Sequence, residues 1–170
     1  MMRAPALVLT LIASSAAAAP QPQLRLTPDG LGPVRMGMTR KQVEAALHIR
    51  LEGEPIEDEK SCIEMVPAGR EQGLWFMFEE YKLTRISIGK PSRVTTPKGI
   101  GIGASADQVK RTYGRGLKVE PHHYLELPAE YLTFWTVPGK RGVRFETDLK
   151  RRVETIHAGT SSIQYVEGCA

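Results

Sequence analysis

The sequence predicts an α+β fold in which two tandem α-β-β-β units form one antiparallel sheet, with both helices packed on one face. A seven-residue motif is repeated: residues 37–43 read GMTRKQV, and residues 103–109 read GASADQV. Three short apolar runs separated by turn residues follow each copy, which is typical of an antiparallel meander. Recurrence at one offset indicates a structural repeat, so we expect unit one at about residues 31–89 and unit two at about residues 99–159.

The first element is a secretory signal peptide over residues 1–18. Arg3 precedes a short apolar run, and small residues follow that run, as in cleavable leader peptides. The run is too short to span a bilayer, and no cysteine follows it to carry a lipid anchor. We therefore expect cleavage near Ala18, no transmembrane segment, and a soluble, monomeric mature chain in the bacterial periplasm or outside the cell.

Residues 19–170 are expected to form a single domain closed by a disulfide bond. About 150 residues suffice for one hydrophobic core but are too few for two domains of usual size. The mature chain contains two cysteines, Cys62 and Cys169, and an oxidising compartment favours their pairing over two free buried thiols. Such a bond would close a loop of around 100 residues and stabilise the fold by restricting the unfolded chain, as the chain-entropy model describes.

Each copy of the motif is expected to begin a helix. Thr39 and Gln42, like Ser105 and Gln108, have the capping-box spacing, in which two side chains satisfy two free backbone amides at a helix start. Apolar residues at helical spacing follow both caps, so each helix has one stripe to bury. We expect the helices at about residues 39–48 and 105–113.

Runs of apolar and β-branched residues predict the strands. The acidic, proline-containing segment at residues 50–60 is expected to be an exposed loop, and the alternation of Leu24 and Leu26 suggests a short strand in the lead-in. The expected strands of the sheet are residues 62–66, 74–78 and 83–88 in unit one, residues 131–136, 143–147 and 153–158 in unit two, and a possible short strand at 117–120.

The sheet face turned away from the helices is the expected contact surface. Successive strand residues alternate between faces, so one face collects apolar side chains and the other a mixture of aromatic and charged ones. Trp, Tyr, Met and Arg are enriched in the centres of protein interfaces. The alternative is that the lead-in, residues 120–128 or the C-terminal tail covers this face. The expected partner-binding residues are Trp75, Met77, Arg85, Tyr131, Trp135 and Arg144.

The main functional hypothesis is a non-enzymatic exported module that binds an envelope protein through this open face. One alternative is a module that binds a small molecule or a cell-wall fragment by stacking on the same aromatic side chains. Another is a hydrolase, which a pocket joining His157 to Glu146 would favour. No catalytic residue or cofactor is assigned, because Ser161 and Ser162 lack the surrounding pattern of a nucleophile elbow.

Three other motifs favour structural roles. The glycines of residues 99–103 precede a helix but lack the spacing and the lysine of a phosphate-binding loop. His122 and His123 are adjacent and would point to opposite sides in extended backbone, so no metal site is expected. The basic clusters at residues 140–141 and 150–152 lie in consecutive hairpin turns, hence at opposite ends of the sheet, and do not form one nucleic-acid footprint.

The repeated motif carries a resemblance to a known superfamily. Gly-x-Thr/Ser-x-x-Gln-Val followed by a meander resembles the tandem helix-plus-sheet exported proteins, which include the β-lactamase inhibitor proteins and the small lipoprotein of the outer-membrane barrel assembly machine. Residues 164–169 are also similar to the tails of exported bacterial proteins with this layout. The resemblance implies a scaffold whose open sheet face contacts another protein. It implies no target enzyme and no lipid anchor, because neither an inhibitor motif nor the lipoprotein's N-terminal cysteine is present.

Overall fold

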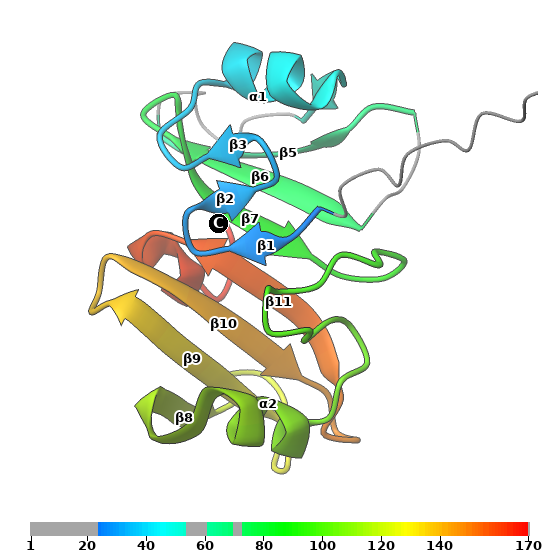
Figure 1. Cartoon of the computed structure of the whole chain (residues 1–170), viewed down its shortest axis with the longest axis vertical. Helices are drawn as coiled ribbons and strands as arrows, with labels where there is room; N and C mark the ends of the chain where they lie inside the picture. The colour runs from blue at the N-terminus through cyan, green and yellow to red at the C-terminus, as the bar shows by residue number, and fades with distance from the viewer. Residues whose placement is uncertain (1–23, 54–60, 70–72, 170) are drawn as a thin grey trace, which may run out of the picture.

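The computed structural model describes residues 24–53, 61–69 and 73–169 and has an α+β fold (Figure 1). The expected signal peptide and its cleavage site at Ala18 lie outside these residues, as does most of the segment at 50–60. Within the described part of the chain, no helix is both long enough and apolar enough to cross a bilayer. The fold class that the sequence predicts is therefore confirmed at the level of two helices and a large antiparallel sheet.

The main sheet has eight strands, and every neighbouring pair in it is antiparallel. Their order is β4-β5-β6-β7-β11-β10-β9-β8, so the central contact joins the last strand of each expected unit. The seven longest strands lie where the sequence places them, within two residues at each end. The strands are β4 Leu51–Glu52, β5 Ile63–Pro67, β6 Leu74–Glu79, β7 Lys82–Ile88, β8 Leu117–Pro121, β9 Glu130–Val137, β10 Arg141–Thr147 and β11 Val153–Gly159.

Two features of the strands differ from expectation. The short strand expected around Leu24 and Leu26 corresponds to β1 Leu26–Thr27, but in the described part of the chain it belongs to a second, three-stranded sheet, with β2 Gly30–Leu31 and β3 Val34–Arg35, that the sequence did not predict. Leu51 in β4 is buried, so the expectation of an exposed loop is wrong at that position. Two-residue strands carry too little periodicity to be predicted from sequence, because pairing with a neighbour rather than local propensity forms them.

Helices α1 Arg40–Leu47 and α2 Ala106–Tyr113 begin at the predicted caps. Thr39 Oγ1 accepts a hydrogen bond from the amide of Gln42, and Gln42 Oε1 accepts one from the amide of Thr39, which completes the capping box. Ser105 Oγ accepts from the amide of Gln108 in the same way. The predicted helix starts are confirmed.

The glycine that opens each motif docks its helix onto a strand of the main sheet. Gly37 and Gly103 have φ angles of 87° and 85°, a region that only glycine occupies without strain. The amide of Gly37 donates to the carbonyl oxygen of Leu83 at the start of β7, and the amide of Gly103 donates to that of Val153 at the start of β11, both at 2.8 Å. The two copies of the motif thus make the same contact with their strands.

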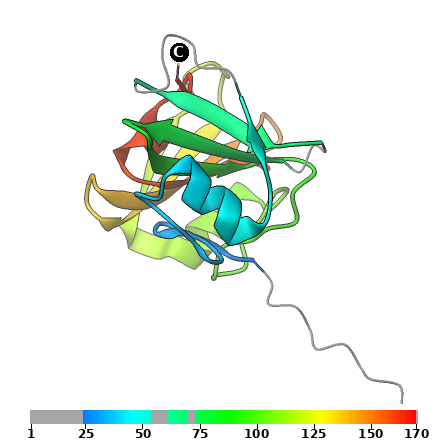
Figure 2. The same cartoon turned by 90° about the horizontal axis from the view of Figure 1, so that it is seen from above.

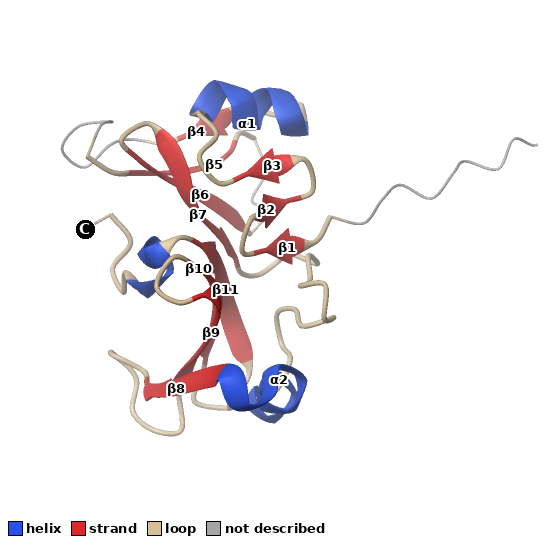
Figure 3. Ribbon diagram, turned by 60° about the vertical axis from the view of Figure 1, so that its left-hand side comes forward, coloured by secondary structure: helices blue, strands red, loops and turns tan. Residues whose placement is uncertain are grey.

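The molecule has three layers, which Figure 3 shows edge-on. Helices α1 and α2 and the small sheet β1–β3 cover one face of the main sheet, and Figure 2 shows the C-terminal tail on the opposite side. That tail comprises the short 3-10 helix η2 Ser161–Gln164 and residues 165–169. The core lies between the helix layer and the sheet and contains the expected apolar side chains, among them Phe76, Phe78, Ile86, Leu132, Val143, Phe145 and Ile156.

Cys62 and Cys169 form a disulfide bond, as the sequence predicts. Their sequence separation is 107 residues, so the bond fastens the end of the tail to the start of β5. The tail is consequently held at both ends, by β11 where it begins and by the disulfide where it ends. A disulfide is compatible with the oxidising environment that exported proteins meet.

Candidate functional site

The polar face of the sheet is covered, which corrects the expectation of an open face. Its centre lies beneath η2 and residues 165–169 (Figure 3). The loop at residues 122–129 folds over Tyr131, whose ring stacks on that of His122 at a centroid distance of 4.5 Å. The alternative foreseen from the sequence, coverage by the connection and the tail, is the one observed. Of the six expected contact residues, Met77, Arg85, Tyr131 and Arg144 are buried, and Trp75 and Trp135 are half-buried.

The side chain of Arg85 holds the tail by donating hydrogen bonds to backbone carbonyl oxygens of the tail. Its Nη1 donates to the carbonyl oxygens of Ser162 at 3.1 Å and Tyr165 at 3.0 Å. Its Nη2 donates to Glu64 Oε1 at 2.7 Å, an ion pair between β7 and β5. A guanidinium group has several donors in a rigid plane, so one side chain can satisfy both the tail and the carboxylate.

Arg144 fixes the next part of the tail from β10. Its Nη1 donates to the carbonyl oxygens of Ile163 at 3.3 Å and Gln164 at 3.1 Å. The guanidinium carbon lies 3.7 Å from the ring centroid of Tyr131, a cation–π contact. Burial lowers the pKa of Arg144, while the nearby Glu146 opposes that shift. Two buried cations therefore bind four consecutive tail carbonyls, from residue 162 to residue 165.

Strand register brings a serine, a histidine and a glutamate together on this covered face. Ser87 in β7 lies directly opposite His157 in β11, and Ser87 Oγ is 2.7 Å from His157 Nδ1. Glu146 in β10 is the diagonal neighbour of His157, and its Oε1 lies 3.2 Å from His157 Nε2. Diagonal cross-strand neighbours are within reach of long side chains, which explains why this contact forms.

The ionisation states of this trio follow from burial and hydrogen bonding. Burial lowers the pKa of His157, although the hydrogen bond with Glu146 works in the opposite direction. Burial alone would raise the pKa of Glu146, but the hydrogen bond from His157 and the positive charge of Arg144 help to bring it below its usual value. At neutral pH the imidazole is therefore neutral and the carboxylate charged. Nε2 then donates a hydrogen bond to Glu146, and Nδ1 accepts a hydrogen bond from the hydroxyl of Ser87.

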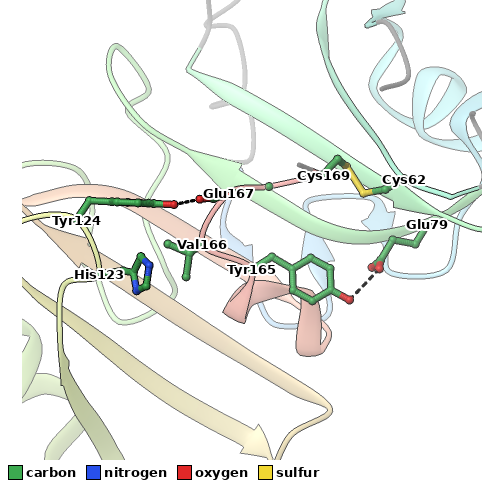
Figure 4. A pocket seen from close by; sticks show the side chains of 9 residues that line it. Cys62, Glu79, His123, Tyr124, Tyr165, Val166, Glu167 and Cys169 are labelled. Atoms are coloured by element: carbon green, nitrogen blue, oxygen red, sulfur yellow. Dashed lines mark hydrogen bonds between the residues drawn. A yellow bond between two sulfur atoms is a disulfide. The ribbon is translucent and has the colours of Figure 1, made fainter. Parts of the chain in front are cut away.

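Two hollows flank tail residues 165–168. The inner hollow, about 420 Å³, has the sheet face as its floor and is lined by Glu64, Trp75, Arg85, Ser87, Glu146, Thr155 and His157 together with the tail. The outer hollow, about 480 Å³, is lined by Cys62, Glu79, His123, Tyr124 and residues 165–169 (Figure 4). Both volumes fall in the range of small-ligand sites.

The outer hollow presents exposed aromatic rings beside carboxylates. Tyr124 and Tyr165 are 57% and 42% exposed, and Figure 4 shows their hydroxyls directed at Glu167 and Glu79 respectively. Tyr165 Oη donates to Glu79 Oε1 at 3.0 Å. These hydrogen bonds raise the pKa of each tyrosine, so both hydroxyls remain protonated donors at neutral pH. The sequence did not indicate this arrangement, because Tyr124 and Glu167 are 43 residues apart.

The remaining candidate motifs have structural partners. His122 Nδ1 accepts from the amides of Tyr124 and Leu125 and shapes its loop. Arg151 pairs with Asp107 at 2.7 Å, and the glycine-rich turn at residues 99–103 uses its Gly103 amide to dock α2. Among the described residues, no group of three histidine, cysteine or acidic side chains is placed to hold a metal ion. These motifs therefore make contacts within the fold.

Fold and site together define a small, disulfide-closed α+β protein whose polar sheet face is capped by its own tail. No family model matches the sequence, and no curated protein does. Among solved structures, a cysteine-rich secretory protein from Staphylococcus aureus subsp. aureus Mu50 is similar, with a TM-score of 0.45 and 10% sequence identity over 82% of this chain and 52% of that chain. The chain thus spans about half the length of that protein. A likeness this limited does not indicate a shared function.

Proposed function

We propose that this chain is an exported binding module that holds a protein partner at the outer hollow beside its C-terminal tail. The observation that carries the proposal is the pair of exposed tyrosines, Tyr124 and Tyr165, that line one hollow. Two buried arginines and the disulfide fix the tail that carries Tyr165, and a hydrogen bond from its own amide to His122 Nδ1 holds Tyr124 in its loop. Exposed tyrosines on rigid backbone bind with little loss of conformational entropy, which is why they are enriched in contact sites. The proposal moves the expected contact surface from the sheet face to the tail that covers it.

The chemistry of the outer hollow favours a basic side chain on the partner. Glu79 and Glu167 supply negative charge, and the two tyrosine rings offer faces for a cation–π contact. An arginine or lysine entering the hollow would meet both kinds of group. The net charge of the whole chain is +4, so this attraction is local to the hollow rather than a property of the overall field.

Capture from native envelope extract tests the proposal. The mature chain from residue 19, in its oxidised form, should retain a specific partner, and Tyr124→Ala with Tyr165→Ala should reduce its recovery at least tenfold. Leu149→Ala, which removes another exposed apolar side chain at 54% exposure, serves as the matched control and should capture normally. Equal recovery by the double variant and the wild type would contradict the proposal.

A second candidate is binding of a small molecule or cell-wall fragment, which the volumes of the two hollows favour. Here Trp75 would stack on the ligand from the wall of the inner hollow. Thermal-shift screening with envelope glycans and small metabolites distinguishes the two, because a bound ligand stabilises the folded state by RT ln(1 + [L]/Kd) and so raises Tm. A ligand that stabilises the wild type but not Trp75→Phe would support this candidate.

We further propose that the chain is exported by residues 1–18, with cleavage near Ala18, and acts as a monomer in the bacterial periplasm or outside the cell. N-terminal sequencing of the exported protein tests the cleavage site. We also propose that the fold consists of two copies of one unit. The matched contacts of Gly37 with β7 and of Gly103 with β11 support this description. The resemblance to the superfamily of the β-lactamase inhibitor proteins stays a prediction of the paired motif.

A further inference from the structure

We infer that Ser87 is an acyl-accepting nucleophile, with His157 as its base and Glu146 as the group that orients the base, in the inner hollow. This inference goes beyond the proposed partner binding and does not depend on it. The partner would bind at the outer hollow, whereas the trio lines the inner hollow between the tail and the sheet. The substrate class is a carboxylic ester small enough for a hollow of about 420 Å³.

The contacts define the roles. A hydroxyl within hydrogen-bond reach of an imidazole, whose other nitrogen is held by a carboxylate, is the general arrangement of an activated serine. The 2.7 Å contact from Ser87 Oγ to His157 Nδ1 and the 3.2 Å contact from His157 Nε2 to Glu146 Oε1 provide it. The two ring nitrogens are exchanged relative to the Ser-His-Asp triad, but such an arrangement is recognised by the role of each group rather than by its atom label.

The inner hollow also supplies charge stabilisation. Arg85 lies two residues before Ser87 on the same face of β7, about 7 Å along the strand. Its Nε is buried and, among the described residues, has no hydrogen-bond partner. A donor that is already in place and out of water stabilises developing negative charge without reorganising. Arg85 lines the same hollow as the trio, so we assign its positive charge the role of stabilising the developing oxyanion.

The reaction balances as an ester hydrolysis. Ser87 Oγ forms a bond to the ester carbonyl carbon while its proton moves to His157 Nδ1, and the carbonyl oxygen takes the displaced electron pair. Collapse of this intermediate breaks the bond to the alcohol, which leaves with the proton from His157 and yields acyl-Ser87. Water then attacks the acyl group with His157 as base, releasing the carboxylic acid and restoring the serine. Glu146 stabilises the imidazolium in both halves of the reaction.

Covalent labelling of the oxidised mature chain with an alkynyl fluorophosphonate tests the inference. Peptide mass spectrometry should map a single adduct to Ser87, and Ser87→Ala should abolish it. His157→Gln should slow labelling at least 100-fold, since general-base catalysis contributes factors of this size. Ser162, which is also buried but bonds to Thr160, provides an internal control and should stay unlabelled.

The adduct is mapped on the wild-type chain, so a positive or a negative result at Ser87 does not depend on whether a variant folds. Turnover of p-nitrophenyl acetate, with an initial burst equal to the enzyme concentration, is the expected second readout. Absence of a Ser87 adduct, or labelling at an unchanged rate in His157→Gln, would overturn the inference. Partner capture by the tyrosine surface would be unaffected by either result.

Discussion

Loss of the disulfide should destabilise this chain strongly, and the loop length sets the size of the effect. The double variant Cys62→Ser with Cys169→Ser opens a loop whose ends are 107 residues apart. In the chain-entropy model, a loop of this length restricts the unfolded state by about 5 kcal/mol at 25 °C. Domains of this size have unfolding free energies of about 5–15 kcal/mol, so the loss is a large fraction of the total.

Urea-induced unfolding of the oxidised wild type and the double variant measures this loss. We expect the free energy of unfolding to fall by about 3–5 kcal/mol, because removing a native disulfide from a small domain typically costs about 2–5 kcal/mol and the long loop places this one in the upper part of that range. The m-value should rise at the same time, since an unfolded chain without the bond exposes more surface. Tyr81→Ala, at another exposed position, should change the free energy far less. A loss below about 1 kcal/mol in the double variant would refute this account of how the tail is held.

Three further predictions address the tail, the repeated motif and the buried histidine. Arg144→Met should lower the free energy of unfolding by about 2–4 kcal/mol in urea titration and raise amide exchange in residues 161–169, because two charge-assisted hydrogen bonds to the tail are lost; unchanged exchange would contradict it. Gly37→Ala and Gly103→Ala should each destabilise by about 1–2 kcal/mol and by similar amounts, since an added Cβ meets no atom within 4 Å and only the positive φ opposes it; unequal effects would argue against equivalent units. Burial holds the pKa of His157 below its usual 6.5, so the unfolded chain binds this proton more readily than the folded chain. The contribution of His157 to the free energy of unfolding should be complete above pH 6.5 and should fall by at most about 1.4 kcal/mol per pH unit as the pH decreases below that value. His157→Gln should reduce that slope, measured by urea titration at several pH values.

Local rules predicted the elements well because those elements depend on neighbouring residues in the chain. The capping spacing of Thr39 and Gln42 fixes the start of α1, and a serine and glutamine at the same spacing start α2. The period of two in the meander separates the apolar from the polar face, so the alternation of residues alone assigns Phe76 and Phe145 to the buried side. The oxidising compartment expected from residues 1–18 was the basis for predicting that the two cysteines pair, and the disulfide confirms that pairing.

The site was predicted only in part, because its residues meet through long-range register and through the path of the tail. The sequence placed Trp75, Arg85, Arg144 and His157 on one sheet face. It did not indicate that two arginines would bind backbone carbonyls, because a carbonyl acceptor carries no sequence pattern. It also did not place Ser87 opposite His157, since that pairing depends on which strands become neighbours across the two units.

The sequence by itself therefore determined the helices, the meanders, the alternation of faces and the disulfide, which follow from residue spacing, local propensity and the expected compartment. Only the tertiary structure decided that β7 pairs with β11 and that the tail closes over the polar face. The physical reason is that a two-residue period fixes which side a residue faces but not what lies above it. The tail supplies four backbone carbonyl acceptors to the buried guanidinium groups of Arg85 and Arg144, and buried charges need such partners to be stable out of water.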